Sequence, residues 1–160
     1  GLRHTKGDIT GWLPILVVVD GLSTSASEAF AAAMRHFRRA VVAGATETFG
    51  KGTIQSAGNG WFSYDFLITT GEYLIGTARD WVSVQCIGVT PDIILPHLRG
   101  PSAGRWECKD RRALKGSGMM PNAPKRTPYR ELYPAKYRII LEMVEAYKKD
   151  LASRYQPSPQ

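Results

Sequence analysis

The fold is decided by residues 13–43, which read LPILVVVDGLSTSASEAFAAAMRHFRRAVVA. Leu13 to Val19 is a continuous apolar run rich in β-branched residues, typical of a strand buried on both faces of a parallel sheet. Ala26 to Arg38 is rich in alanine and predicts a helix, whose buried face we expect to consist of Phe30, Met34 and Phe37. Ala40 to Ala43 predicts a second short buried strand, which completes a β-α-β unit.

The rest of the chain predicts a β-rich half and a C-terminal helix. Residues 62–70, 73–75 and 81–87 alternate or cluster like strands, and residues 93–95 form a further apolar run after a turn. Ala135 to Ser153 predicts an amphipathic helix, one side of which is lined by Tyr137, Ile140, Val144, Tyr147 and Leu151. The fold class is therefore α/β. We divide the chain into a core over residues 1–97, a basic Pro/Gly-rich loop over residues 98–134, and a C-terminal helix and tail over residues 135–160.

Length and composition exclude several classes of protein. A chain of 160 residues fits one domain with a real core, and its apolar and charged fractions argue against global disorder. No uncharged apolar stretch reaches the roughly 18 residues that a membrane span needs. Cys86 and Cys108 are too few for a disulfide framework and lack the spacing of a metal site. The three histidines are scattered, so we expect neither a metal nor another cofactor.

The net charge of +7 comes almost entirely from one stretch. Residues 98–134 hold nine basic and three acidic side chains, which account for +6 of the total. The same stretch is rich in proline and glycine, so it predicts an irregular, solvated loop rather than a helix that enters a nucleic-acid groove. Few aromatic residues are interleaved for base stacking. We therefore expect no nucleic-acid partner.

Small hydroxyl residues occupy the turn between the first predicted strand and the predicted helix. Ser25 is the candidate nucleophile, because its side chain can project from the turn while the following Ala26 N–H points out of the first helical turn. Such an N–H can donate to a developing oxyanion. The alternative is that the hydroxyls only cap the helix, and the candidates for that role are Ser23, Thr24, Ser25 and Ser27.

Lys51 lies 26 positions after Ser25 in the sequence, between Gly50 and Gly52. A lysine accepts a proton only as the neutral amine, a form that burial favours, and Phe49 supplies apolar cover beside it. The flanking glycines allow a close backbone approach. The alternative is an exposed lysine in a Gly-rich turn. Residues 44–51 also look like a phosphate-binding loop, but five residues separate the glycines and glycine follows the lysine, so we reject nucleotide binding.

Three ordered motifs resemble the C-terminal processing peptidases, also called tail-specific proteases. Residues 23–34 resemble the nucleophile segment of that family, residues 48–55 its lysine segment, and residues 88–94 the turn and strand that close its catalytic core. The resemblance implies that Ser25 is the nucleophile and Lys51 the general base. It also implies that Gln55 orients the lysine and that the Ala26 amide is one oxyanion donor.

The resemblance also carries expectations for the whole protein. It implies an α/β fold similar to the Clp protease and crotonase folds, and a serine-type endopeptidase that cleaves proteins near their C-termini with a Ser–Lys dyad. The expected partners are polypeptides with exposed C-termini. The expected location is extracytoplasmic, either periplasmic or secreted.

This sequence departs from the family pattern in ways that suggest a fragment. The Arg-x-Asn-x-Gly-Gly segment, whose glycine amide usually completes the oxyanion hole, is absent, and so is the PDZ domain that captures substrate C-termini. The loop before Lys51 is one residue longer than the family pattern. We expect a missing N-terminal segment or a homo-oligomer to complete the molecule, and any membrane-adjacent location to depend on the missing regions.

Two other classes of protein remain as alternatives. The first is a non-catalytic binding module of the same fold, which has no need of Ser25, Lys51 and Gln55 together. The second is a crotonase-type acyl-CoA enzyme, which needs a carboxylate in its site. We see no acid placed for that role, because Glu28 in the first helical turn is expected to be a capping or dipole carboxylate.

Overall fold

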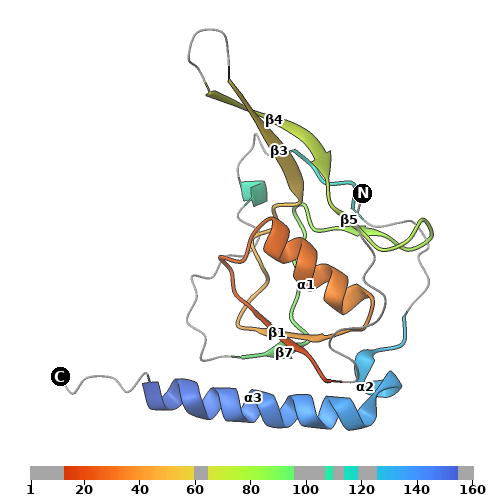
Figure 1. Cartoon of the computed structure of the whole chain (residues 1–160), viewed down its shortest axis with the longest axis vertical. Coiled ribbons are helices and arrows are strands. Elements are labelled where there is room, and N and C mark those ends of the chain that lie inside the picture. The colour runs from red at the N-terminus through yellow and green to blue at the C-terminus, as the bar shows by residue number, and fades with distance from the viewer. Residues whose placement is uncertain (1–12, 60–64, 96–106, 110–113, 119–125, 155–160) are drawn as a thin grey trace, which may run out of the picture.

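The structure is a computed structural model that describes residues 13–59, 65–95, 107–109, 114–118 and 126–154. In chain order its elements are β1 (Leu16–Val19), α1 (Ala26–His36), β2 (Val41–Gly44), β3 (Thr53–Asn59), β4 (Asp65–Glu72), β5 (Leu74–Ile75), β6 (Val82–Ser83), β7 (Ile93–Ile94), the 3-10 helix η1 (Glu107–Lys109), α2 (Tyr129–Leu132) and α3 (Pro134–Arg154). The predicted α/β class is confirmed (Figure 1).

A small parallel sheet forms the centre of the molecule. Its strand order is β1-β2-β7, and Leu16 of β1 lies opposite Val41 of β2 in the register. Both neighbouring pairs run parallel, which confirms the predicted β-α-β unit. Since the crossover between β1 and β2 contains α1, the turn after β1 delivers the chain directly to the start of that helix.

Helices cover both faces of this sheet (Figure 1). Val42 of β2 belongs to a buried cluster with Ala31 and Ala32 of α1. Its neighbours Val41 and Ala43 point the other way, because successive strand residues alternate between faces, and they join a second cluster that includes α3. Each fully buried valine adds about 1.5–3 kcal/mol relative to exposure. These alternating side chains therefore fix both helices against one strand.

The predicted buried face of α1 is wrong. Phe30 and Phe37 are 57% and 55% exposed, whereas Glu28, Ala31 and Ala32 are buried. The face that meets the sheet consists of small residues, because alanine lets the helix approach the strand backbone more closely than phenylalanine does. The two phenylalanines face outward instead, and Met34 is half-buried.

β1 is also less buried than the apolar run predicted. Leu13 and Val18 are 66% and 40% exposed, and within the described part of the chain β1 lies at the edge of its sheet. The strand begins at Leu16, two residues after Pro14, which has no N–H to give to a ladder. β2, which has neighbours on both sides, is buried at every position.

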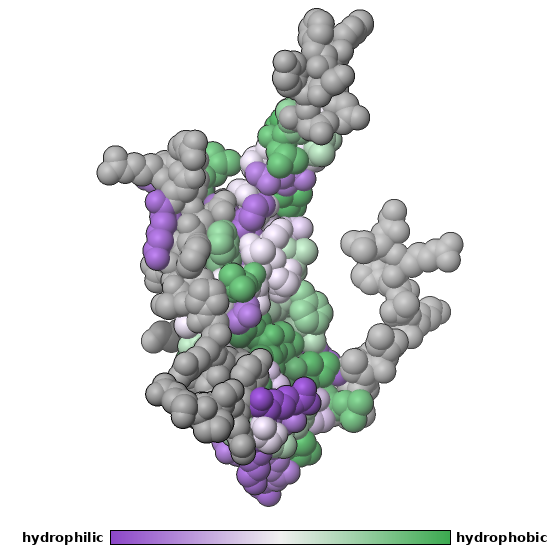
Figure 2. Space-filling view, turned by 90° about the vertical axis from the view of Figure 1, so that its left-hand side faces the viewer, coloured by the Kyte–Doolittle hydropathy of each residue, from purple (hydrophilic) through white to green (hydrophobic). Residues whose placement is uncertain are grey.

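An antiparallel hairpin of β3 and β4 projects from the body (Figure 1). β4 confirms the predicted strand after residue 62, although residues 62–64 lie outside the described residues. β3 was not predicted, because Ser56 and Gly58 interrupt its apolar pattern. The hairpin exposes Phe66, Leu67 and Ile68. Figure 2 shows this apolar surface near the top of the molecule.

Of the predicted strand over residues 81–87, only Val82–Ser83 forms as β6. The following residues form a turn, in which Cys86 has a positive φ of 64° that a strand does not allow. The predicted C-terminal helix is confirmed as α3, with Ile140 and Val144 buried and Tyr137 and Tyr147 packed beside them.

The basic stretch over residues 98–134 lies mostly outside the described residues. The part that is described is not only an irregular loop, because it includes η1 and α2. Arg126 is also not simply solvated: it pairs with Asp80 and donates to the His36 carbonyl at 2.7 Å. None of the described helices combines the length and apolar character needed to cross a membrane.

Candidate active site

The turn between β1 and α1 is organised by one carboxylate. Asp20 Oδ1 accepts the N–H groups of Leu22 and Ser23 at 3.0 and 2.8 Å, and also the Ser23 hydroxyl at 3.0 Å. The Asp20 N–H in turn donates to Ser23 Oγ at 3.1 Å. An aspartate that bonds its own following backbone in this way fixes a turn. The chain therefore enters α1 along a defined path.

Ser25 stands at the end of this turn with an unusual backbone. It is the N-cap residue of α1, and its φ of 58° and ψ of −121° lie outside the conformations that a non-glycine residue ordinarily adopts. Such a conformation costs about 1–3 kcal/mol and tends to occur at functional sites. A strained serine between a strand and a helix is also the geometry of a nucleophile elbow, which presents the hydroxyl outward.

The neighbouring serines have local partners for their hydroxyls. Ser23 Oγ donates to Asp20, as above, and Ser27 Oγ donates to the Thr24 carbonyl at 2.7 Å. Ala26 is the first residue of α1, so its N–H has no acceptor within the helix. The backbone donor next to Ser25 is thus available to an incoming group.

The loop that carries Lys51 depends on its two glycines. Gly50 has a φ of 88°, which favours glycine, and a Cβ built on Gly52 would lie 2.5 Å from the Gln85 nitrogen. The expected close backbone approach is confirmed at Gly52, whereas Gly50 provides the unusual backbone conformation. Lys51 is half-buried, and its Nζ donates to the Thr53 carbonyl at 3.3 Å.

Glu28 joins the serine turn to the lysine loop. Its side chain is fully buried, and Oε2 accepts the Ser25 N–H at 2.9 Å and the Lys51 N–H at 2.8 Å. Oε1 accepts the Gly50 N–H at 2.6 Å and the Thr48 hydroxyl at 2.5 Å. A buried carboxylate needs such donors to offset its desolvation. The predicted capping role of Glu28 is confirmed, but the same carboxylate also holds the second motif.

The third motif packs against the second. Thr48 Oγ1, which donates to Glu28, accepts the Val89 N–H at 2.8 Å, and the Thr48 N–H donates to the Val89 carbonyl at 3.3 Å. Gly88 has a φ of 68°, and a Cβ there would lie 2.7 Å from the Thr48 carbonyl. All three sequence motifs therefore meet around Glu28 and Thr48.

A turn over residues 84–88 supports the lysine loop from the other side. Gln85 Oε1 accepts the Gly52 and Thr53 N–H groups at 2.6 and 3.1 Å, and the Cys86 N–H donates to the Gly50 carbonyl at 2.8 Å. Gln85 Nε2 donates to the Leu114 carbonyl at 2.9 Å. The backbone is thus held on both sides of Lys51.

Cys86 also forms a disulfide with Cys108, and the two Cα atoms are 5.3 Å apart. Two cysteines are too few for a framework, and this single bond was not predicted from the sequence. It attaches η1 to the turn that supports the lysine loop. The segment around residue 108 is thereby tied to the candidate site.

The structure brings some of the predicted residues together and not others. The backbones of Ser25 and Lys51 share one carboxylate, but the hydrogen bonds of the described residues include none between the Ser25 hydroxyl and the Lys51 amine. Gln55 lies exposed on β3, opposite Thr69 and just after a register shift at Ile54. Its role in orienting Lys51 stays a prediction.

Sequence reasoning missed Thr48 and Gln85, whose polar atoms organise the site. Neither belongs to a local pattern, because Thr48 contacts residues 20 and 41 positions away and Gln85 contacts a loop more than 30 positions away. Across the part of the chain that the structure describes, no group of three or more His, Cys, Asp or Glu side chains is placed to hold a metal.

Comparisons with known proteins agree on one family. The model of peptidase family S41 matches residues 4–95. A carboxy-terminal-processing protease of Bartonella bacilliformis is 39% identical over 89 residues, covering 56% of this chain and 20% of the relative. A tail-specific protease of Haemophilus influenzae is 37% identical over 89 residues, covering 52% of this chain and 13% of the relative.

Among solved structures, a photosystem II D1 C-terminal processing protease matches with a TM-score of 0.44 and 30% identity, covering 58% of this chain and 26% of that one. The chain spans a fifth or less of the length of the two curated relatives. The family match itself covers more than half of this chain and includes all three motifs. This chain belongs to peptidase family S41.

Proposed function

We propose that this chain carries the Ser–Lys site of a serine endopeptidase that cleaves proteins near their C-termini, within a core similar to the Clp protease and crotonase folds. Ser25 is the nucleophile, Lys51 the general base and Gln55 the residue that orients it. The Ala26 N–H is one oxyanion donor. The observation that carries the proposal is the Glu28 carboxylate, which accepts the N–H groups of both Ser25 and Lys51.

The reaction follows from these positions. Ser25 Oγ attacks the scissile carbonyl carbon while its proton passes to the Lys51 amine, which first turns away from the Thr53 carbonyl. The Ala26 N–H donates to the oxyanion of the tetrahedral intermediate. The C–N bond then breaks, and Lys51 returns the proton to the leaving amine. Water hydrolyses the acyl-enzyme through the same two groups.

The strained backbone supports Ser25 as the choice among the serines. Ser23 and Ser27 already donate their hydroxyls to nearby acceptors, and Ser25 alone of the three has a positive φ. A conformation that costs stability persists where the surrounding contacts impose it, and here Glu28 and the turn at Asp20 do so. The same contacts leave the Ala26 N–H facing the space in front of the helix.

The disulfide between Cys86 and Cys108 supports an extracytoplasmic location. Disulfides form and persist in oxidising compartments such as the periplasm or the extracellular space, and they are rare in the cytosol. The substrates in this proposal are polypeptides with exposed C-termini, in keeping with the carboxy-terminal-processing protease and the tail-specific protease that the chain resembles.

Covalent labelling tests the nucleophile directly. A fluorophosphonate probe reacts with an activated serine, so incubation with the 160-residue chain followed by peptide mass spectrometry should locate the adduct on Ser25. Ser25→Ala should abolish labelling, and Lys51→Arg should strongly reduce it because a guanidinium does not lose its proton at working pH. The matched control Ser27→Ala, which removes only the bond to the Thr24 carbonyl, should label normally.

Two results would count against the proposal. An adduct on Ser23 or Ser27 would show that the wrong serine has been chosen. A chain that unfolds cooperatively yet acquires no adduct would favour the non-catalytic binding module. Cleavage of an unfolded protein with an apolar C-terminus is measured in parallel with the full-length protein that contains this chain, where new C-termini should appear with the native sequence and not with Ser25→Ala.

A further inference from the structure

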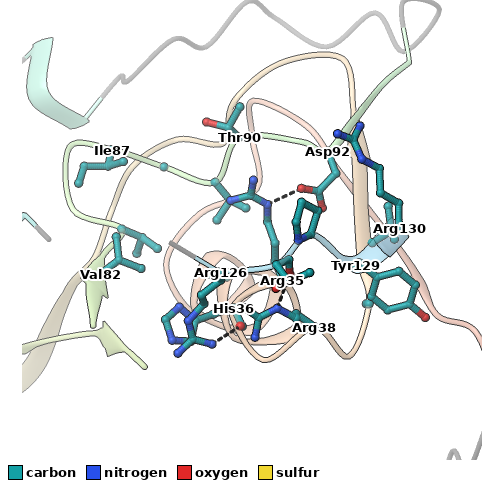
Figure 3. A pocket seen from close by; sticks show the side chains of 18 of the residues that line it. Arg35, His36, Arg38, Val82, Ile87, Thr90, Asp92, Arg126, Tyr129 and Arg130 are labelled. Carbon is teal, nitrogen blue, oxygen red and sulfur yellow. Dashed lines mark hydrogen bonds and ion pairs between the residues drawn. The ribbon is translucent and has the colours of Figure 1, made fainter. Parts of the chain in front are cut away.

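A concave site lies at the other end of α1 from Ser25. Ser25 precedes the first residue of the helix and His36 is its last residue, so the two lie about 16 Å apart along the axis. The cavity beside His36 has a volume of about 560 Å³ and is lined by α1, by residues 82–92 and by residues 126–130 (Figure 3). This volume falls within the range of about 300–1,000 Å³ found for small-molecule sites.

Four arginines line this cavity, namely Arg35, Arg38, Arg126 and Arg130, and we call it the arginine pocket. Two carboxylates neutralise part of their charge. Arg35 Nε lies 2.7 Å from Asp92 Oδ1, and Arg126 pairs with Asp80. These two acids are therefore already engaged with an arginine each.

The other two arginines leave the pocket with an excess of positive charge. Arg38 Nε donates to a neutral group, the Thr127 carbonyl, at 2.7 Å. Arg130 is exposed and makes no hydrogen bond or ion pair with another described residue. Burial and repulsion from Arg38 both lower the pKa of Arg126, which indicates that the two guanidinium groups are close enough to repel each other. An anion between the arginines would relieve that repulsion.

His36 adds a polar group without adding charge. Burial, followed by repulsion from Arg126 and Arg38, lowers its pKa below the ordinary value of 6.5, so the imidazole is neutral at pH 7. Its Nε2 is buried and has no hydrogen-bond partner within the described part of the chain, although Asp80 Oδ1 lies 3.5 Å away. Unsatisfied buried nitrogens are rare and call for a partner.

The remaining wall of the arginine pocket is apolar. Val82, Val84, Ile87 and Val89 contribute aliphatic side chains, and Val82 and Ile87 lie on the opposite side from Arg130 and Tyr129 in the view of Figure 3. An apolar wall facing a cationic rim suits a ligand that has an apolar body and an anionic end. Arginine forks match the two oxygens of a carboxylate.

We propose that the arginine pocket binds an organic carboxylate, with its apolar body against the valine and isoleucine wall and its carboxylate on the arginine rim. The same chemistry is offered by a free small acid and by the C-terminus of a peptide that ends in an apolar residue. This binding is separate from the proposed catalysis, because it uses the opposite end of α1 and none of the residues of the Ser–Lys site.

Isothermal titration calorimetry on the 160-residue chain tests the proposal with phenylacetate as the probe. Phenylacetate should bind with a dissociation constant of about a millimolar or lower. Phenylacetamide, which is neutral, and acetate, which lacks the apolar ring, should each bind at least about tenfold more weakly than phenylacetate. A second arm compares N-acetyl-alanyl-phenylalanine with its C-terminal amide. Tighter binding of the peptide acid than of phenylacetate assigns the site to peptide C-termini, and the reverse order assigns it to free acids.

Arg130→Gln is the informative variant, since Arg130 makes no hydrogen bond or ion pair with another described residue. It should weaken phenylacetate binding about tenfold while leaving Tm unchanged. Arg138→Gln is the matched control, because Arg138 is an exposed arginine of α3 that does not line the pocket. Equal binding of the acid and the amide would overturn the proposal. So would an equal effect of the two substitutions, or no binding of either acid at millimolar concentration.

Discussion

At the scale of single residues, Ser25 is the N-cap of α1 and shares a capping box with Glu28, but its backbone differs from that of a residue that only caps a helix. An ordinary N-cap serine adopts an extended backbone, whereas Ser25 has a positive φ that its side chain makes costly. A residue chosen only to cap the helix would be replaced by glycine without loss of stability. Keeping a side chain here fits a need for its hydroxyl.

Ser25→Gly should therefore make the chain more stable, by about 1 kcal/mol, because glycine adopts this conformation without strain. The matched control is Ser27→Gly, which lies inside the first turn of α1 and should be destabilising, since glycine is a poor helix former. Urea denaturation of the three proteins measures both changes. A Ser25→Gly variant as destabilised as Ser27→Gly would show that the backbone at Ser25 is not strained.

The ordered motifs of the sequence predict site roles for Ser25, Lys51 and the Ala26 amide. They do not predict the contacts around Glu28. A carboxylate in the first turn of a helix ordinarily faces water and caps the backbone beside it. Glu28 is buried because Thr48, Gly50 and Lys51 cover it from a loop 20 to 23 residues away. Such donors depend on the tertiary fold and leave no local pattern.

At the scale of elements, the turn over residues 84–88 determines how the lysine loop is held. Gln85 uses its carbonyl oxygen for Gly52 and Thr53 and its amide for Leu114, so one side chain bridges the loop and a distant segment. The local pattern around Gln85 predicted a strand, since Val82 and Val84 precede it in alternation with Ser83. The turn forms instead because the Gln85 side chain and the Cys86 N–H make hydrogen bonds to the lysine loop.

Two substitutions at Gln85 should separate these contacts. Gln85→Leu removes the acceptor, so the Gly52 and Thr53 amides lose their partner and should exchange with solvent at least about tenfold faster. Gln85→Glu keeps an acceptor oxygen for both amides but cannot donate to Leu114, so protection of Gly52 and Thr53 should largely remain. Hydrogen exchange read by NMR measures both. Equal loss of protection in the two variants would show that the Leu114 contact, not the acceptor, holds the loop.

The expected burial of α1 failed for a reason that also belongs to this scale. The spacing of Phe30, Met34 and Phe37 indicates an apolar face, but spacing alone does not say which partner covers it. The sheet took the alanine face, where Ala31 is fully buried. The distance between a helix and a strand depends on side-chain size at the contact. The face of small residues therefore packs next to β2.

At the scale of the whole molecule, the α/β class, the parallel β-α-β unit and α3 could be predicted, because each rests on a strong local pattern. The β3–β4 hairpin and the disulfide could not. Apolar and polar residues alternate too little in β3 for its sequence to predict a strand. The pairing of Cys86 with Cys108 depends on η1 lying next to the turn after β6, which no local pattern shows. The end of the basic stretch was likewise predicted as solvated, although Arg126 is held by Asp80 and His36.

His36 lies where α1, Asp80 and the segment at Arg126 meet, so its titration should report on the assembly of these parts. Its folded pKa is held below 6.5 by burial first and then by Arg126 and Arg38, which outweigh the nearby Asp80 carboxylate. The unfolded chain therefore binds more protons than the folded chain between that lowered pKa and about 6.5, and stability rises with pH through this window. As pH falls through the same window, folding stability is lost.

The expected result is a Tm that falls between about pH 7.5 and about pH 5.5, and that falls by less in His36→Gln, whose side chain does not titrate. Glu72 does not obscure this window, because hydrogen bonds from Ser117 and Ser83 outweigh its burial and hold its pKa below 4.5, so its own loss of stability comes at lower pH. Differential scanning calorimetry at both pH values measures the difference. An identical fall of Tm in the two proteins would mean that protonation of His36 does not oppose folding, and that another group is responsible for the acid sensitivity of the chain.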